Sequence, residues 1–192
     1  INGATWVENI YGCTDEYADN YDEIANVDNG SCTYTYLDIA SDTENFTYGG
    51  TYGGKYYYIS NYETNFDNAH TLSYSYDGYL TVISSGEENS FVVDMLSAYV
   101  EYYAHLGYYI RDNGWQWVEG ESSNYTNWHS SQPDDPGYQN AIIYVHDLNG
   151  RYGQWGDANA EYHFVIESHI APVNYGCTNP DACNYDPDAE ED

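Results

Sequence analysis

Two stretches near the ends of the chain are rich in short side chains that carry oxygen ligands. Residues 12–33 and 170–192 each place Asp and Asn at short intervals, and the first stretch has a Gly at its turn. Short polar side chains at two-residue steps can wrap one hard cation such as calcium, and Gly permits the tight turn. The alternative is a solvated acidic turn held by a disulfide. The candidate metal ligands are Asp15, Asn20, Asp22 and Asp28 in the first stretch, and Asn179, Asp181, Asn184, Asp186, Asp188 and Asp192 in the second.

The two stretches are copies of one sequence. Gly12-Cys13-Thr14 matches Gly176-Cys177-Thr178, and the same offset of 164 residues (176 − 12 = 164) holds along the rest of the match. An internal repeat of this kind indicates a reused module. The copies resemble the Gly-Cys-Thr…Asn-Tyr-Asp…Asp-Gly-Ser-Cys modules found in tandem in secreted marine proteins. The second copy stops before its last cysteine would arrive, so we expect a processed fragment or one unit of a longer array.

The four cysteines all lie in these modules. We expect Cys13 and Cys32 to pair, and a loop of that size is worth about 3 kcal/mol in the chain-entropy model. Cys177 has no matching partner at the end of the second copy. It can pair with Cys183 or with a cysteine of another subunit.

Aromatic, proline and acidic residues follow one another in a distinctive order between residues 114 and 168. Trp115-Gln116-Trp117 is followed by Asn127-Trp128, Gln132-Pro133-Asp134, Trp155-Gly156-Asp157 and the run Phe164-Val165-Ile166-Glu167. Together with the upstream pattern described next, this order resembles the C-type lectin-like domain over residues 46–169. The resemblance implies an α+β fold with two helices, mixed or antiparallel sheets and a long loop, here without the usual disulfides.

The upstream half of that region supplies the expected frame. Residues 55–60 are typical of a first core strand, and apolar residues at helical spacing from Phe66 to Tyr76 predict a helix. Ser85 and Glu88 fit a capping box at the start of a second helix. The apolar stripe that follows, from Phe91 to Leu96, suits a helix that faces a core.

The resemblance also implies a candidate calcium and sugar site. In the family the proline of Gln132-Pro133-Asp134 is cis and directs two side-chain oxygens at one calcium ion, and Gln-Pro-Asp goes with galactose-type sugars. Gln139 and Asp157 would complete the site, with Trp155 or Tyr138 stacking on the sugar. Two departures weaken it, because Gly156 replaces an amide ligand and Gln139 replaces an acidic one, while calcium prefers six to eight oxygens.

Composition restricts the partners and the setting. There are 32 acidic residues against three basic ones, a net charge of −29, which excludes nucleic acid and disfavours anionic membranes. Disulfide-type cysteines and strong self-repulsion favour an extracellular, secreted or cell-surface location. Three triplets, at Asn29, Asn45 and Asn124, fit the glycosylation pattern. The expected organisation is an N-terminal segment at 1–11, modules at 12–33 and 170–192, a linker or strand at 34–45 and the lectin-like domain at 46–169.

Two functions of different classes fit these features, and neither is an enzyme, because no catalytic motif is present. The first is a structural subunit of a fibre or sheath, joined head-to-tail through its modules. The surplus of 26 tyrosines favours it, since surface Tyr is typical of interfaces. The alternative is a secreted calcium-dependent lectin that binds glycans through Gln132 and its neighbours. The sequence alone places the fibre subunit first.

Overall fold

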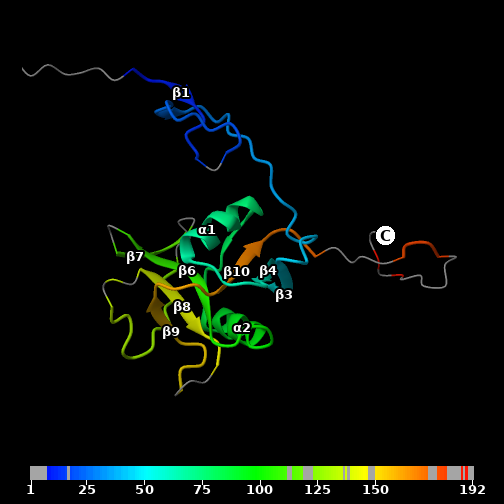
Figure 1. Cartoon of the computed structure of the whole chain (residues 1–192), viewed down its shortest axis with the longest axis vertical. Helices are drawn as coiled ribbons and strands as arrows, with labels where there is room; N and C mark the ends of the chain where they lie inside the picture. Colours follow the sequence, from blue (N-terminus) through cyan, green and yellow to red (C-terminus); the bar gives the residue numbers. More distant parts are fainter. Residues whose placement is uncertain are drawn as a thin grey trace, which may run out of the picture. The chain divides into compact units, whose positions relative to one another are not determined.

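The computed structural model describes residues 8–16, 18–111, 114–118, 123–135, 137, 139–146, 150–172, 177–180, 187 and 189. The chain divides into two compact units, Ile1–Leu37 and Asp38–Asp192, called here the N-terminal unit and the larger unit. Figure 1 shows the helices and most strands in the larger unit. None of the helices in the described part of the chain is long and apolar enough to cross a membrane.

The N-terminal unit is a loop-rich module held by one disulfide. Strand β1 (Tyr11–Gly12) pairs in parallel with β2 (Val27–Asp28). The expected disulfide is present, with 2.11 Å between the sulfurs of Cys13 and Cys32. Gly12 is required here, because a Cβ atom at this position would lie 2.9 Å from the Ala25 side chain.

The larger unit is built on a mixed sheet. Its strands are β3 (Phe46–Tyr52), β4 (Lys55–Ser60), β5 (Gly78–Leu80), β6 (Tyr103–Arg111), β7 (Gly114–Trp117), β8 (Asn140–Tyr144), β9 (Trp155–Ala158) and β10 (His163–Ser168). The order is β3-β4-β10-β6-β8-β9, with β5 on β10 and β7 on β6. β10 runs parallel to β6 and antiparallel to β4, so the last strand joins the first hairpin to the rest of the sheet.

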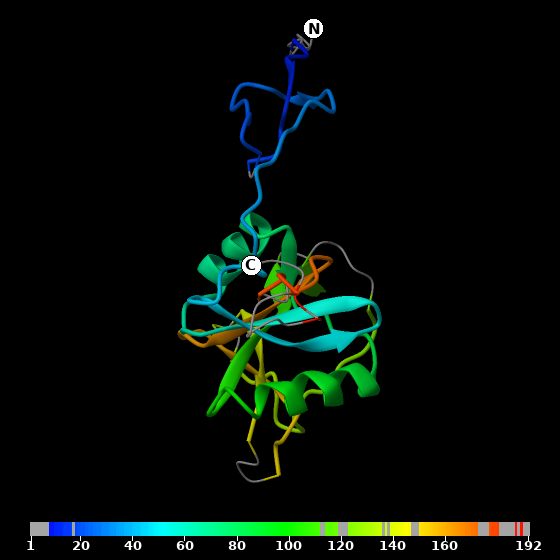
Figure 2. The same ribbon diagram turned by 90° about the vertical axis from the view of Figure 1, so that its right-hand side faces the viewer.

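Two helices flank the sheet, as the sequence predicts. Helix α1 (Phe66–Ser75) begins at Asn65, whose side chain accepts a hydrogen bond from the Asn68 amide. Helix α2 (Gly86–Leu96) begins at Ser85, whose side chain accepts from the Glu88 amide. Figure 2, turned by 90° from Figure 1, shows again that α1 and α2 lie on opposite sides of the strands.

The core accepts several tyrosines because each buried phenol has a partner. Tyr57 donates to Glu88, Tyr58 to the Ile170 carbonyl and Tyr76 to Asp42. Tyr144 is also buried. Other tyrosines lie on the surface as expected, namely Tyr11, Tyr21, Tyr34, Tyr36, Tyr48, Tyr99, Tyr102 and Tyr152. The aromatic composition is therefore used both inside and outside the fold.

Candidate functional site

A long loop between β7 and β8 runs beside strand β9, which fixes its path. The Trp155 amide donates to the Asn127 carbonyl at 2.8 Å, and the His129 amide donates to the Trp155 carbonyl at 2.9 Å. The Gln132 amide then donates to the His129 carbonyl at 2.8 Å. These bonds bring the Gln132–Pro133 peptide, which is cis, to the strand that carries Asp157.

Three of the predicted ligands lie together in this loop. The Asp157 amide donates to Gln132 Oε1 at 2.9 Å, and Gln132 Nε2 donates to Asp134 Oδ1 at 2.9 Å. The Asp157 carboxylate accepts the amides of Asp134 and Asp135 at 3.1 and 3.0 Å. Asp157 is 7% exposed, whereas Asp134 and Asp135 are exposed. The site thus pairs the half-buried Gln132 with the exposed Asp134, and both are hydrogen-bonded to the buried Asp157.

Gln139 is not joined to this group. No hydrogen bond among the described residues links its side chain to Gln132, Asp134 or Asp157, and its carbonyl accepts the Ile110 amide at 2.8 Å. It lies instead in the wall of an open cleft of about 540 Å³. The other residues of that wall are Phe66, Asp67, Tyr109, Ile110, Arg111 and Asn140.

The prediction that Trp155 stacks on a sugar is wrong. Trp155 is fully buried, and its Nε1 donates to Asn89 Oδ1 at 2.8 Å. The rings of Trp117, Trp128 and Tyr125 surround it at centroid distances of 5.6, 6.0 and 5.7 Å. An indole held by its nitrogen inside an aromatic cluster supports the loop and cannot reach a ligand. Tyr138, the other stacking candidate, lies outside the described residues.

The oxygen donors do not fit a calcium shell in this arrangement. Gln132, Asp134 and Asp157 offer two carboxylates and one amide, and the Gln132 oxygen and both Asp157 oxygens already accept backbone N–H groups. A fourth ligand at position 156 would require the Tyr144 ring to move, because a Cβ atom there would lie 2.5 Å from the Tyr144 hydroxyl. Calcium takes six to eight oxygens. Within the described residues, no group of three His, Cys, Asp or Glu side chains is placed to hold a metal.

The Asp and Asn residues of the first module mostly bind the backbone. Asp22 accepts the Ile24 amide at 3.1 Å, Asp28 accepts the Gly30 amide at 2.9 Å, and Asn20 accepts the Thr33 amide at 2.8 Å. Asp15 accepts the Tyr34 hydroxyl at 2.6 Å. These are the contacts of solvated acidic turns, so metal binding by the module stays a prediction.

The second module is described only in part. Asn179 is exposed, and Cys177 carries a free thiol. Its remaining predicted residues lie outside the described part of the chain: Asp181, Cys183, Asn184, Asp186, Asp188 and Asp192.

The glycosylation candidates differ in their surroundings. The side chains of Asn29 and Asn124 are exposed, and Asn29 Oδ1 accepts the Ser31 amide. Asn45 Nδ2 donates to both carboxylate oxygens of Asp42 at 3.0 and 3.1 Å. Attaching a sugar to Asn45 would remove one of the two Nδ2 hydrogens that face Asp42, whereas Asn124 is exposed, so glycosylation at either position stays a prediction.

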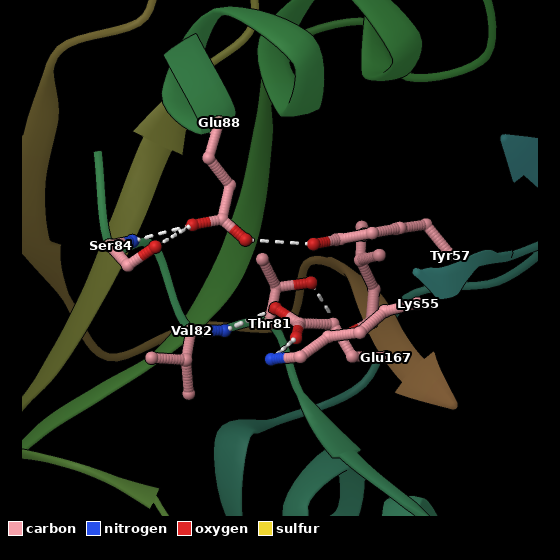
Figure 3. Close-up of polar contacts among 8 residues, drawn as sticks. Lys55, Tyr57, Thr81, Val82, Ser84, Glu88 and Glu167 are labelled. Carbon is pink, nitrogen blue, oxygen red and sulfur yellow. Dashed lines mark hydrogen bonds and ion pairs between the residues drawn. The ribbon is translucent and has the colours of Figure 1, made fainter. Parts of the chain in front are cut away.

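Sequence reasoning missed a buried polar network between α2 and β10. Figure 3 shows the Glu88 carboxylate between Ser84 and Tyr57, and the Glu167 carboxylate beside Lys55 and Val82. Lys55 Nζ lies 2.8 Å from Glu167 Oε2, and the Val82 amide donates to Glu167 Oε1 at 2.7 Å. Glu88 accepts from Tyr57 and from both the amide and the hydroxyl of Ser84.

Burial and the ion pair affect the pKa values of Glu167 and Lys55 in different ways. Burial is the largest influence on the Glu167 carboxyl, and it raises the pKa to about 7 even though Lys55 lowers it. For Lys55 the hydrogen bond and charge of Glu167 outweigh burial and raise the pKa of the ammonium. The Glu167 carboxyl is thus fully buried, with the Lys55 ammonium group 2.8 Å away. The capping pattern at Ser85 and Glu88 was visible in the sequence, but the partners of the Glu88 carboxylate were not.

Comparison with known proteins identifies the family. The family model described as Lectin C-type domain matches residues 62–165. The chain is 34% identical over 86 residues to a perlucin-like protein of Mytilus galloprovincialis, covering 41% of this chain and 54% of that protein. It is 41% identical over 61 residues to asialoglycoprotein receptor 2 of Mus musculus, covering 31% of this chain and 19% of the receptor. The chain therefore spans about half of the first relative and a fifth of the second.

Solved structures agree with the fold. The C-type lectin CEL-I from Cucumaria echinata matches with a TM-score of 0.56 at 20% identity, covering 66% of this chain and 96% of that one. SPL-1 in its GlcNAc complex matches with a TM-score of 0.57 at 19% identity, covering 69% and 99%. The family match over more than half of the sequence and the shared architecture together show that this chain belongs to the C-type lectin domain family.

Proposed function

We propose that this chain is an extracellular, non-enzymatic carbohydrate-recognition protein that binds glycans at the loop of Gln132 and Asp134. The observation that supports it most is the half-buried Gln132 amide and the exposed Asp134 carboxylate, held 2.9 Å apart across the cis peptide and joined to Asp157. A carboxylate has about four acceptor sites, so Asp134 can accept a sugar hydroxyl while it keeps its bond to Gln132. The amide adds both a donor and an acceptor, which suits a pair of neighbouring hydroxyls.

The relatives support this function better than the fibre subunit that the sequence alone placed first. A structural neighbour is described as the human scavenger receptor C-type lectin carbohydrate-recognition domain, and another was solved with GlcNAc. The high tyrosine content is also weaker support for a fibre subunit, because part of it is used in the core. Tyr57, Tyr58 and Tyr76 each serve the core with a hydrogen-bonded hydroxyl.

The test is retention on immobilised galactose, GlcNAc and mannose, followed by a glycan array. The proposal expects the wild-type chain to bind at least one of these ligands. Asp134→Ala should lower binding at least about tenfold, a loss of roughly 1.4 kcal/mol. Glu44→Ala removes another exposed acid in the same unit and is the matched control, which should bind as the wild type does. Absence of binding to any glycan, or equal binding by Asp134→Ala, would refute the proposal.

A further inference from the structure

Hydrogen bonds to Asp157 hold the loop that carries Gln132 and Asp134, where a bound metal ion could otherwise fix it. From this we infer that glycan binding at the loop does not require calcium, because Asp157 and the Tyr144–Arg151 pair organise the site. The inference rests on the proposed function for the identity of the ligand. Its structural part, that calcium does not bind here, can be tested without any sugar.

The first support is the engagement of Asp157. Its two carboxylate oxygens accept the amides of Asp134 and Asp135, and its own amide donates to Gln132. A buried carboxylate that accepts two backbone N–H groups is stabilised without a cation. These three bonds connect β9 to both sides of Pro133, which is the work that a shared metal ion would do in fixing the loop.

The second support is the space beside Gly156. Tyr144 is 7% exposed, and its ring packs edge-on against Tyr103 at a centroid distance of 5.5 Å. Its hydroxyl would meet a Cβ atom at position 156 at 2.5 Å, a separation that real Cβ atoms do not show. The phenol therefore fills the volume in which a side-chain ligand next to Asp157 would have to stand.

The third support is a positive charge built into the same place. Arg151 Nη1 lies 3.3 Å from the Tyr144 hydroxyl, and its guanidinium carbon is 5.3 Å from the centre of that ring. Burial raises the pKa of Tyr144, while the charges of Arg151 and Asp157 act on it in opposite directions. The guanidinium is thus held at the hydroxyl that lies against Gly156, the residue before Asp157. Its positive charge opposes the entry of a divalent cation there.

The first experiment compares wild-type glycan retention in millimolar calcium and in excess EDTA. We expect retention to change less than about twofold, while a loss of more than about tenfold in EDTA would overturn the inference and leave the proposed function intact. Calorimetric titration of calcium into the full chain is the second measurement. Wild type and Asp157→Asn should bind the same number of calcium ions, including any held by the Asp-rich modules. Loss of one site in Asp157→Asn would overturn the inference even if no glycan were found.

A gain-of-ligand variant tests the role of Tyr144. Tyr144→Ala combined with Gly156→Asn makes room for an amide beside Asp157 and should show a larger calcium-dependent rise in melting temperature than wild type. Gly156→Asn alone is the matched control and should gain no such rise, because the phenol still occupies the space. A calcium-dependent rise in the single variant equal to that of the double variant would contradict the proposed role of Tyr144.

Discussion

His105 gives the clearest prediction of pH-dependent stability. It lies on β6, is fully buried, and its Nε2 is 3.0 Å from the Thr64 carbonyl. The rings of Phe66 and Tyr162 pack edge-on against it, at 5.9 and 5.2 Å. Burial lowers the pKa of the imidazole from 6.5 to about 4, although the Thr64 carbonyl raises it in part. The folded protein therefore keeps this side chain neutral in mild acid, where the unfolded chain protonates it.

The sign and size follow from this difference in pKa. Between pH 6.5 and pH 4 the unfolded state binds more protons at His105, so stability falls as the pH falls through that window. Each pKa unit is worth about 1.4 kcal/mol, which gives a loss of about 2 kcal/mol by pH 5 and about 3 kcal/mol by pH 4.

The assay is urea unfolding followed by tryptophan fluorescence at several pH values, because Trp115, Trp117, Trp128 and Trp155 all lie in the larger unit. His105→Gln keeps a donor for the Thr64 carbonyl but does not titrate. Its free energy of unfolding relative to wild type should rise by about 2 kcal/mol from pH 7.5 to pH 5.

Two features of the design isolate this effect. Burial raises the pKa of Glu167 to about 7, so that carboxyl makes the protein less stable as the pH rises from 4.5 to 7. This opposite trend is common to both proteins and cancels in the difference. His146→Gln, at an exposed histidine, is the matched control and should follow wild type. A constant difference between His105→Gln and wild type across the window would refute the reasoning.

Three further predictions concern the frame that carries the site. Lys55→Met should cost about 3 kcal/mol in urea unfolding because it leaves the buried Glu167 charge unpaired, and adding Glu167→Gln should recover most of the loss; equal stabilities of the two variants would argue against the ion pair. Cys13→Ser should make the N-terminal unit sensitive to limited proteolysis by removing the bond to Cys32, worth about 3 kcal/mol, without changing the melting of the larger unit. Gly107→Ala should lower the melting temperature, because its Cβ would lie 2.5 Å from the carbonyl that ends β5; an unchanged value would show that the backbone there can shift.

Much of the fold was predictable because its signals are local. Each helix and the strand at Lys55 is indicated by a pattern within about ten residues. These patterns are the cap at Ser85, the apolar stripes of the two helices and the run that begins at Lys55. The position of β10 was not predictable from such signals. It lies between β4 and β6, antiparallel to one and parallel to the other, and this depends on contacts across most of the larger unit.

The candidate site was predictable to the extent that its residues follow one another in the chain. The pair at Gln132 and Asp134 shares one turn, and Asp157 was placed with it through the resemblance to a known family. Burial was harder to foresee. A tryptophan such as Trp155 is a residue type that can stack on a sugar ring. Only its packing and its hydrogen bond to Asn89 show that it faces inward. Likewise, nothing near Gly156 in sequence reveals that Tyr144 fills the space beside it.

The positions of the basic side chains have a consequence for which glycans the proposed function would allow. Lys55 pairs with Glu167, Arg151 lies on Tyr144, and Arg111 lies over the ring of Tyr109 at 5.3 Å. Because 32 acidic residues stand against these three basic ones, carboxylates set the electrostatic potential around the chain. A sulfated or sialylated chain would be repelled over a Debye length of about 8 Å at physiological ionic strength, whereas an uncharged one would not. The overall negative charge would then exclude anionic glycans, and the loop of Gln132 and Asp134 would need only to distinguish the arrangement of hydroxyls on uncharged ones.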